Sequence, residues 1–156
     1  MISAWRIDKA HRSAADAFSG EGGIRSSGRW NQAGTRIVYA SGSLSLAALE
    51  KFIHIGDDGR DIKLVAYEAV VPAGVEIRVL KLKDMPPVWK DVPAPRSTMD
   101  IGTKWISSSS TAVLKVPSVV IEAECNFLLN PLHPDFKKIR ISAPSPFRFD
   151  NRMWDK

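Results

Sequence analysis

The residues best suited to chemistry lie between positions 28 and 50. An arginine stands in Gly28-Arg29-Trp30-Asn31, an aromatic ring in Tyr39-Ala40-Ser41 and a carboxylate in Leu46-Ala47-Ala48-Leu49-Glu50. A guanidinium matches a phosphate through paired hydrogen bonds, and an aromatic face can stack on a base. A carboxylate can accept hydrogen bonds from sugar hydroxyls. The three groups together predict a binding site for a nucleotide.

Three consecutive elements are expected to position these groups. The stretch Ser19-Gly20-Glu21-Gly22-Gly23, together with Gly28, predicts a flexible loop whose backbone can approach a ligand closely. Residues 35–40 alternate with β-branched side chains and predict a strand. Ser43 or Ser45 is placed to cap the helix that follows.

The rest of the chain indicates more strands than helices. Further strands are expected at 63–71, 75–82, 119–123, 139–142 and 147–150. A short helix is predicted from a Thr98 cap to Trp105, with a polar loop over 107–110 behind it. The pattern predicts one α+β domain over residues 1–156, with few helices and a central, split, mainly antiparallel sheet.

Length and composition set broad limits on the protein class. The chain has 156 residues, which suits one domain with a core that needs no disulfide, and Cys125 is its single cysteine. No apolar run approaches the roughly 20 residues of a membrane-spanning helix. The N-terminus also lacks the apolar region of a signal peptide. We therefore expect a cytoplasmic protein without contact to a membrane.

The net charge of +5 allows a nucleic-acid partner but does not require one. The basic residues in the second half of the chain are interrupted by apolar or acidic neighbours: Lys81, Lys83, Lys137, Lys138 and Arg140. No recognition helix, zinc finger or arginine-rich segment is present in the sequence. The pattern favours a solvated basic face, which also suits a small anionic ligand or an acidic protein partner.

With two later motifs added, the residues above resemble the RES domain family. These motifs are Val116-Pro117-Ser118 and Asn126-Phe127-Leu128-Leu129-Asn130-Pro131-Leu132-His133-Pro134, and the resemblance runs from Trp5-Arg6 to Phe149-Asp150-Asn151-Arg152. RES proteins are toxins of bacterial toxin–antitoxin pairs that deplete cellular NAD, with a fold similar to that of ADP-ribosyltransferases. The resemblance implies the same fold and activity here.

The resemblance also assigns roles to individual residues. The arginine, glutamate and serine that give the family its name correspond to Arg29, Glu50 and Ser118. Arg29 would hold the diphosphate of NAD, Tyr39 would stack on a ring, and Glu50 would stabilise the positive charge that develops on the ribose. The expected catalytic residues are Arg29, Tyr39 and Glu50, and the expected substrate-binding residues are Arg6, Trp30 and Ser118. The hydroxyl of Ser118 can donate to a phosphate or to Glu50.

Other polar residues are expected to have no catalytic part. His11, His54 and His133 lack the spacing of metal ligands or of a hydrolase triad, so no metal is expected, and NAD is the substrate rather than a cofactor. Asn126, Asn130 and His133 are interpreted as structural residues around a turn.

Several questions stay open at this point. The ribosyl acceptor can be water, inorganic phosphate or a protein side chain, which separates a glycohydrolase, a phosphorylase and an ADP-ribosyltransferase. The resemblance implies an antitoxin with an Xre-like helix-turn-helix part. Because this chain has net positive charge and a glycine-lined site, we expect an acidic segment or chain terminus of the antitoxin to compete with the NAD diphosphate at Arg29. We also expect a toxin dimer in the complex, with the DNA contacts made by the antitoxin. Alternatives are a basic nucleic-acid-binding or nuclease-like toxin, and a noncatalytic module in which Arg29 and Glu50 pair.

Overall fold

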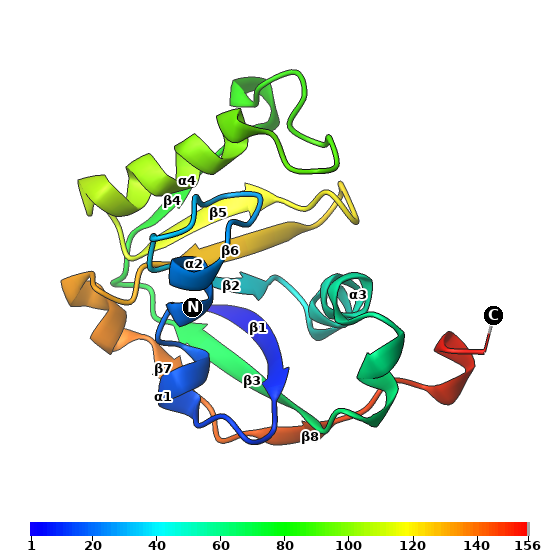
Figure 1. Ribbon diagram of the computed structural model, residues 1–156. Helices are drawn as coiled ribbons and strands as arrows, with labels where there is room; N and C mark the ends of the chain where they lie inside the picture. Colours follow the sequence, from blue (N-terminus) through cyan, green and yellow to red (C-terminus); the bar gives the residue numbers. More distant parts are fainter. Residues whose placement is uncertain (156) are drawn as a thin grey trace.

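One curled sheet runs through the structure (Figure 1). The computed structural model describes residues 1–155, apart from the side chain of Asp58. Within the described residues the strands are β1 (Ile2–Lys9), β2 (Val38–Ser41), β3 (Leu64–Val71), β4 (Ile77–Val79), β5 (Val113–Pro117), β6 (Cys125–Leu129), β7 (Arg140–Ile141) and β8 (Ser145–Phe147). Their order is β4-β5-β6-β2-β1-β3-β7, and β8 also pairs with β3. Only the β4–β5 pair is parallel among the described strands, which confirms a mainly antiparallel sheet.

The two halves of the sheet meet at a narrow junction. β1 pairs with β3 along its full length, and β2 pairs with β6 over all of its residues. Between β1 and β2 the register contains the single pair of Trp5 and Ser41. The expected split is therefore a weakly paired seam inside one continuous sheet.

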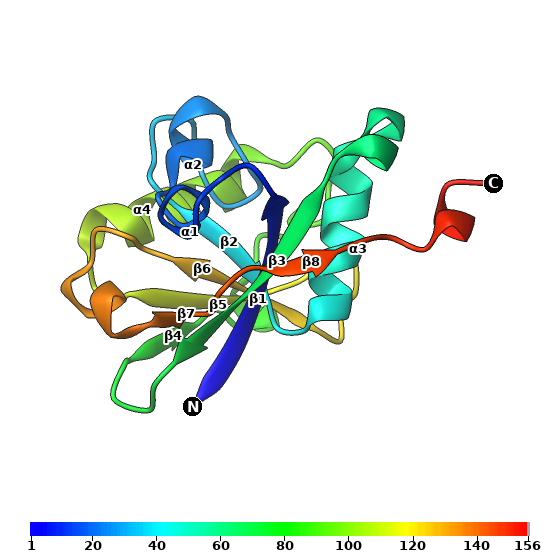
Figure 2. The same ribbon diagram turned by 90° about the horizontal axis from the view of Figure 1, so that it is seen from below.

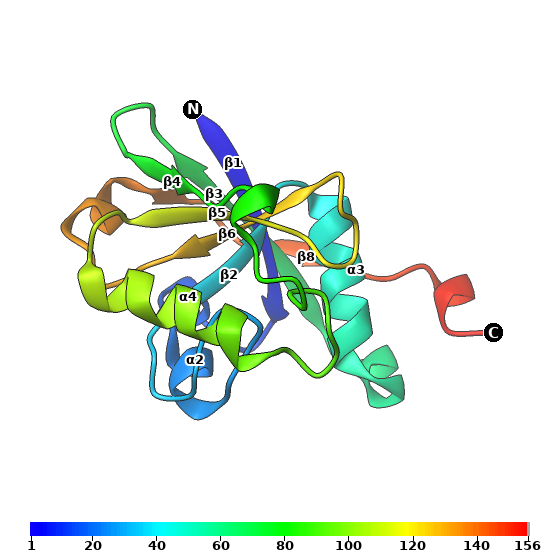
Figure 3. The ribbon, with the colours of Figure 1, turned by 90° about the horizontal axis from the view of Figure 1, so that it is seen from above.

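Helices cover the sheet at several places. They are α1 (Ala14–Ala17), α2 (Glu21–Arg25), α3 (Leu44–Ile55) and α4 (Arg96–Ser108), with the short 3-10 turns η1 (Asp57–Asp61), η2 (Leu82–Asp84), η3 (Pro134–Lys138) and η4 (Asn151–Met153). Figure 3 shows α4 in front of β5 and β6. Trp105 of α4 packs there in a cluster with Leu114 and Leu128. None of the described helices is long and apolar enough to cross a membrane.

The helix that carries Glu50, α3, packs against β1 and β2, and Figure 2 shows it from below the sheet. Ala47 of α3 belongs to a buried cluster with Ile7 and Leu64. The C-terminal segment adds to this cluster, because the ring of Phe52 lies 4.8 Å from that of Trp154. The helix is thus fixed on its apolar side, and its N-cap is Ser43, one of the two predicted residues.

Some local expectations need correction. The expected strand over 119–123 is a turn, because the backbone N–H groups of Val120 and Ile121 donate to Ser118 Oγ and the chain reverses to pair β5 with β6. α4 begins at Arg96 with Pro95 at its N-cap, so Thr98 lies inside the helix and is not its cap.

The glycine-rich stretch also differs from the expected loop. Its second half forms the short helix α2, which begins at Glu21 after Gly20. Gly20 has a φ of 76°, a left-handed conformation that favours glycine at this helix start. The strand at 63–71 is confirmed as β3, whereas those at 75–82, 139–142 and 147–150 are shorter or shifted.

Candidate active site

The carboxylate of Glu50 is held through one of its two oxygens. Oε1 accepts hydrogen bonds from Ser118 Oγ over 3.1 Å and from Asn126 Nδ2 over 2.7 Å. Oε2 has no hydrogen-bond donor among the residues that the structure describes. One oxygen is therefore fixed by the protein, and the other remains available to a ligand.

Both donors come from the β5–β6 hairpin. Ser118 follows the last residue of β5, and Asn126 in β6 lies opposite Val116 of β5 and Ser41 of β2. Ser118 Oγ also accepts 3.1 Å hydrogen bonds from the N–H groups of Val120 and Ile121. The turn thus orients the serine hydroxyl, which donates its hydrogen to Glu50.

Ser118 makes one of its two expected contacts, the hydrogen bond to Glu50, whereas Asn126 differs from the structural role expected for it. Ser118 is 0% exposed, so its hydroxyl lies behind Glu50 and is shielded from a ligand. Asn126 was expected to be structural, yet it makes the shorter contact with Glu50. A signal was present in the sequence, since Asn126 is a polar residue directly before the apolar run of Phe127, Leu128 and Leu129.

Arg29 lies on the loop between α2 and β2 and is tied to the segment that leads into α4. Its Nη1 donates to the carbonyl oxygens of Trp89 and Asp91 over 2.6 and 3.0 Å. Burial lowers the pKa of Arg29 from its ordinary value, and the negative charges of Glu50 and Asp91 oppose that effect. Arg29 thus lies within electrostatic range of Glu50.

Arg29 and Glu50 do not form an ion pair with each other in the described part of the chain. Nε and Nη2 of Arg29 also have no acceptor among the described residues. The guanidinium therefore retains donors that can bind an anion. This geometry gives no support to a module in which the two residues serve as a structural pair.

The hydroxyl of Tyr39 closes the turn that carries Arg29. It donates to Asn31 Oδ1 over 2.6 Å and accepts from the N–H of Trp30 over 3.1 Å. A Cβ at Gly28 would lie 2.7 Å from this hydroxyl, so the close approach requires glycine. Burial raises the pKa of Tyr39 above its ordinary value, and the phenol stays neutral. Its hydroxyl is therefore engaged in hydrogen bonds within the protein, and Tyr39 is one of the residues that line a cavity.

Trp30 contributes to this turn through its backbone. Its ring is 2% exposed and packs in the core with Trp105 and Leu128. A Cβ at Gly102 would lie 1.7 Å from the carbonyl oxygen of Trp30, so α4 packs against this backbone without room for a side chain at position 102. The indole offers almost no surface to a ligand, and we assign it a structural role in place of the expected substrate contact.

Arg6 of β1 completes one wall of the site. It donates to the carbonyl oxygen of Tyr39 and to Asp8 Oδ2, both over 3.0 Å, and Arg12 reaches the same carboxylate oxygen at 3.4 Å. Burial lowers the pKa of Arg6, and the charge of Asp8 opposes this shift. Two arginines around one carboxylate leave an excess of positive charge on this wall.

A cavity of about 210 Å³ lies beside Arg6 and Tyr39, and neither Arg29 nor Glu50 is among its lining residues. Its lining includes Arg6, Arg12, Tyr39 and the glycines from Gly20 to Gly28. Positive charge, an aromatic residue and glycine backbone thus surround this cavity, together with the carboxylates of Asp16 and Glu21. A nucleotide offers phosphate and base to match them.

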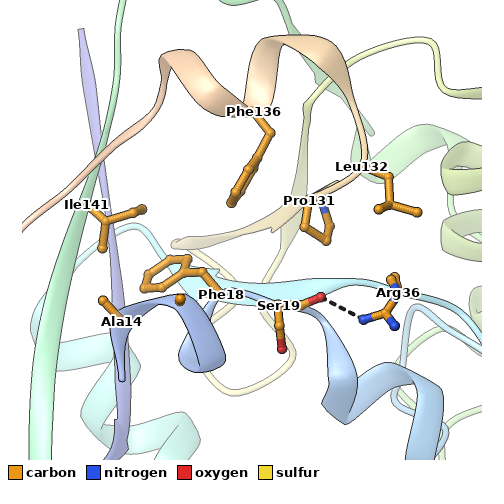
Figure 4. Close-up of a pocket in the computed structure, with 9 residues that line it drawn as sticks. Ala14, Phe18, Ser19, Arg36, Pro131, Leu132, Phe136 and Ile141 are labelled. Atoms are coloured by element: carbon orange, nitrogen blue, oxygen red, sulfur yellow. Dashed lines mark hydrogen bonds between the residues drawn. The ribbon is translucent and has the colours of Figure 1, made fainter. Parts of the chain in front are cut away.

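A larger cavity of about 420 Å³ lies elsewhere (Figure 4). Phe18 and Phe136 line it, with Leu132 and Arg36 at one end, and the side chain of Arg36 donates to the carbonyl oxygen of Ser19 over 3.3 Å. Its lining contains none of Arg29, Tyr39 and Glu50. The smaller cavity shares Tyr39 with the predicted site, and the larger cavity shares none of the three residues. In the described residues no group of three or more His, Cys, Asp or Glu side chains is arranged to hold a metal ion.

Two known proteins match most of the chain. The chain is 38% identical over 154 residues to a protein of Sphingobium sp. named Prs ADP-ribosylating toxin, covering 97% of this chain and 96% of that protein. It is 38% identical over 143 residues to Toxin Res of Yersinia enterocolitica, covering 91% and 93% of the two chains.

A solved structure shows the same fold at low sequence identity. A chain of the Mycobacterium tuberculosis MbcT–MbcA toxin–antitoxin complex superposes with a TM-score of 0.76 at 13% identity, covering 99% of this chain and 87% of that one. The model of the RES domain matches residues 3–150. The chain therefore belongs to the RES domain family.

Proposed function

We propose that this chain is the toxin of a bacterial toxin–antitoxin pair and that it cleaves the nicotinamide–ribose bond of NAD at Glu50. Relatives named as toxins, at 38% identity over most of the chain, support the first part. The second part rests on one observation. Ser118 and Asn126 both donate hydrogen bonds to Oε1 of Glu50, and Oε2 has no donor among the described residues and is available to a ligand.

The chemistry needs a fixed negative charge more than a proton donor. When the bond between ribose C1″ and the nicotinamide nitrogen breaks, its electron pair goes to the positively charged ring, and nicotinamide leaves as a neutral molecule. Positive charge then develops on the ribose. A carboxylate already oriented by two donors stabilises that charge without reorganising. Glu50 Oε2 would contact the ribose hydroxyls on the reacting sugar.

The remaining groups would bind the rest of NAD. The donors of Arg29 that have no protein acceptor suit the diphosphate. The ring of Tyr39 and the cavity beside Arg6 and Arg12 suit an adenine or nicotinamide ring with its ribose. Because the Tyr39 hydroxyl is bonded to Asn31, we assign ligand stacking to the ring and not hydrogen bonding to the hydroxyl.

The acceptor defines a second candidate reaction. Transfer to water gives ADP-ribose, with the water proton released to solvent, and transfer to inorganic phosphate gives ADP-ribose 1″-phosphate. Transfer to a protein side chain gives an ADP-ribosylated target, and the name of the Sphingobium relative favours this alternative. Incubation with NAD labelled in its adenine ring, with and without phosphate and cell extract, separates the three outcomes by where the label appears.

We also propose that an antitoxin holds the enzyme inactive. The related fold was solved as a toxin–antitoxin complex, and Arg29 presents free donors to a carboxylate from a partner. An Xre-like partner would occlude Arg29 with an acidic segment or chain terminus, bind a toxin dimer, and make the DNA contacts itself. A complex that cleaves NAD at the rate of the free toxin would contradict occlusion.

Operator binding by the free chain would instead favour the nucleic-acid alternative. Such binding should then weaken steeply with added salt, because phosphate contacts release counterions. A nucleotide enzyme without a DNA surface should show no such binding.

A further inference from the structure

The amide of Asn126 is a polar group at the start of an apolar run. The residues that follow it in β6, Phe127, Leu128 and Leu129, are 3%, 0% and 0% exposed. Asn126 Oδ1 is buried and has no hydrogen-bond partner among the described residues. A buried acceptor without a donor destabilises a folded protein. Stability alone would favour a different side chain at this position.

The position of Asn126 gives it a firm support. β6 is paired on both sides, with Asn126 opposite Ser41 of β2 and opposite Val116 of β5. The side chain therefore projects from a backbone that is fixed by two neighbouring strands. From there its Nδ2 reaches Glu50 Oε1 over 2.7 Å, the shorter of the two contacts with that oxygen.

We propose that Asn126 is a positioning residue for NAD cleavage, which holds Glu50 Oε1 so that Oε2 faces the reacting ribose. This inference rests on the proposed function. Ser118 supplies the other donor from a separate element, and two donors on one oxygen restrict both the position and the rotation of the carboxylate. The cost of the unpartnered Oδ1 is then explained by function.

The test compares Asn126→Ala with a change at a matched asparagine, Asn130, which directly follows the last residue of β6. Asn130 is 2% exposed, and its Oδ1 accepts a 3.1 Å hydrogen bond from the N–H of Leu132. Nicotinamide release from NAD and thermal unfolding are measured for the wild type, Asn126→Ala and Asn130→Ala. We expect Asn126→Ala to lower kcat by up to about 10²-fold with KM nearly unchanged, the size of effect seen when a reacting group is misplaced.

The control should show the opposite pattern. Asn130→Ala should lower the Tm and leave the kcat of the folded protein near the wild-type value, because its amide bonds only a turn. Asn126→Ala should change the Tm little, since it removes the unpartnered acceptor as well as the donor.

A double variant shows whether Asn126 acts through Glu50. In a Glu50→Gln background, Asn126→Ala should cause little further loss, because residues that act as a unit are not additive. An equal loss in both backgrounds, or a wild-type kcat in Asn126→Ala, would overturn the proposal. If the wild type releases no nicotinamide, the reaction itself fails and the role of Asn126 fails with it. An active wild type beside an unimpaired Asn126→Ala variant refutes only the positioning role.

Discussion

Ser118 Oγ lies 3.1 Å from Glu50 Oε1, although 68 residues separate the two in the sequence. The same hydroxyl oxygen accepts hydrogen bonds from the N–H groups of Val120 and Ile121, so one serine links the β5–β6 turn to the helix that carries the carboxylate. Ser118 therefore supports the Glu50 carboxylate.

Replacement of Ser118 by alanine should reduce both stability and activity. Two backbone N–H groups lose their acceptor, which costs about 1–3 kcal/mol for a buried unsatisfied donor. Glu50 keeps only the contact with Asn126, and kcat should fall by up to about 10²-fold. Chemical denaturation and NAD turnover measure the two effects. Ser45→Ala, an exposed change on the same helix as Glu50, should leave both near wild type.

Arg29→Ala should act mainly on substrate affinity. A charge-assisted contact with the diphosphate stabilises the bound substrate and the transition state alike, so its loss raises KM more than it lowers kcat. Arg25→Ala removes an exposed arginine from neighbouring α2 and serves as the control for net charge. Steady-state kinetics with NAD would contradict the assignment if both variants raised KM equally.

Tyr39→Phe should destabilise the turn while keeping the ring. Asn31 Oδ1 and the N–H of Trp30 lose their partner, and a buried unsatisfied group costs about 1–3 kcal/mol. Because burial raises the pKa of Tyr39 above its ordinary value of 10.0, its contribution to stability is present below about pH 10 and is lost as the pH rises through the folded-state pKa. Urea unfolding as a function of pH should show a steeper alkaline loss in wild type than in Tyr39→Phe, and identical slopes would refute this.

Gly28→Ala tests how closely the turn packs. The new Cβ would lie 2.7 Å from Tyr39 Oη and 2.8 Å from Asn31 Oδ1, and these two atoms form a hydrogen bond with each other. Overpacking of this kind costs about 1–3 kcal/mol, and Arg29 should move with the turn. Gly74→Ala, where a Cβ would meet no atom within 4 Å, is the matched control for the added methyl group. Equal free energies of unfolding for the two variants would show that the turn can shift to accept the methyl group, and would contradict this prediction.

Much of the framework followed from local patterns in the sequence. Alternation over 63–71 correctly predicts β3, and Ser43 caps α3 as expected because its hydroxyl accepts the N–H of Leu46. The strand expected over 119–123 failed for a physical reason. Its β-branched residues suit a strand, but the hydroxyl of Ser118 offers Val120 and Ile121 a local acceptor, and a turn forms.

Some residues of the site could likewise be predicted from their neighbours in the sequence, whereas the roles of others depend on tertiary contacts. Residue types alone suggested Arg29, Tyr39 and Glu50, because a cation, a ring and a carboxylate lie close together in the chain. The parts of Trp30 and Asn126 depend on contacts between distant segments. Gly102 packs closely against the backbone of Trp30, and Asn126 donates a hydrogen bond to Glu50. Neither contact can be predicted from a periodic pattern in the sequence.

The most direct measurement is nicotinamide release from NAD by the purified chain and by its Glu50→Gln variant. This change keeps the size of the side chain and removes the charge that opposes the ribosyl cation. We expect the wild type to consume NAD and Glu50→Gln to lose about 10²–10³-fold in kcat, the usual effect of one electrostatic stabiliser. A folded Glu50→Gln protein that turns over NAD at the wild-type rate, or a wild type that leaves NAD intact, would contradict the account.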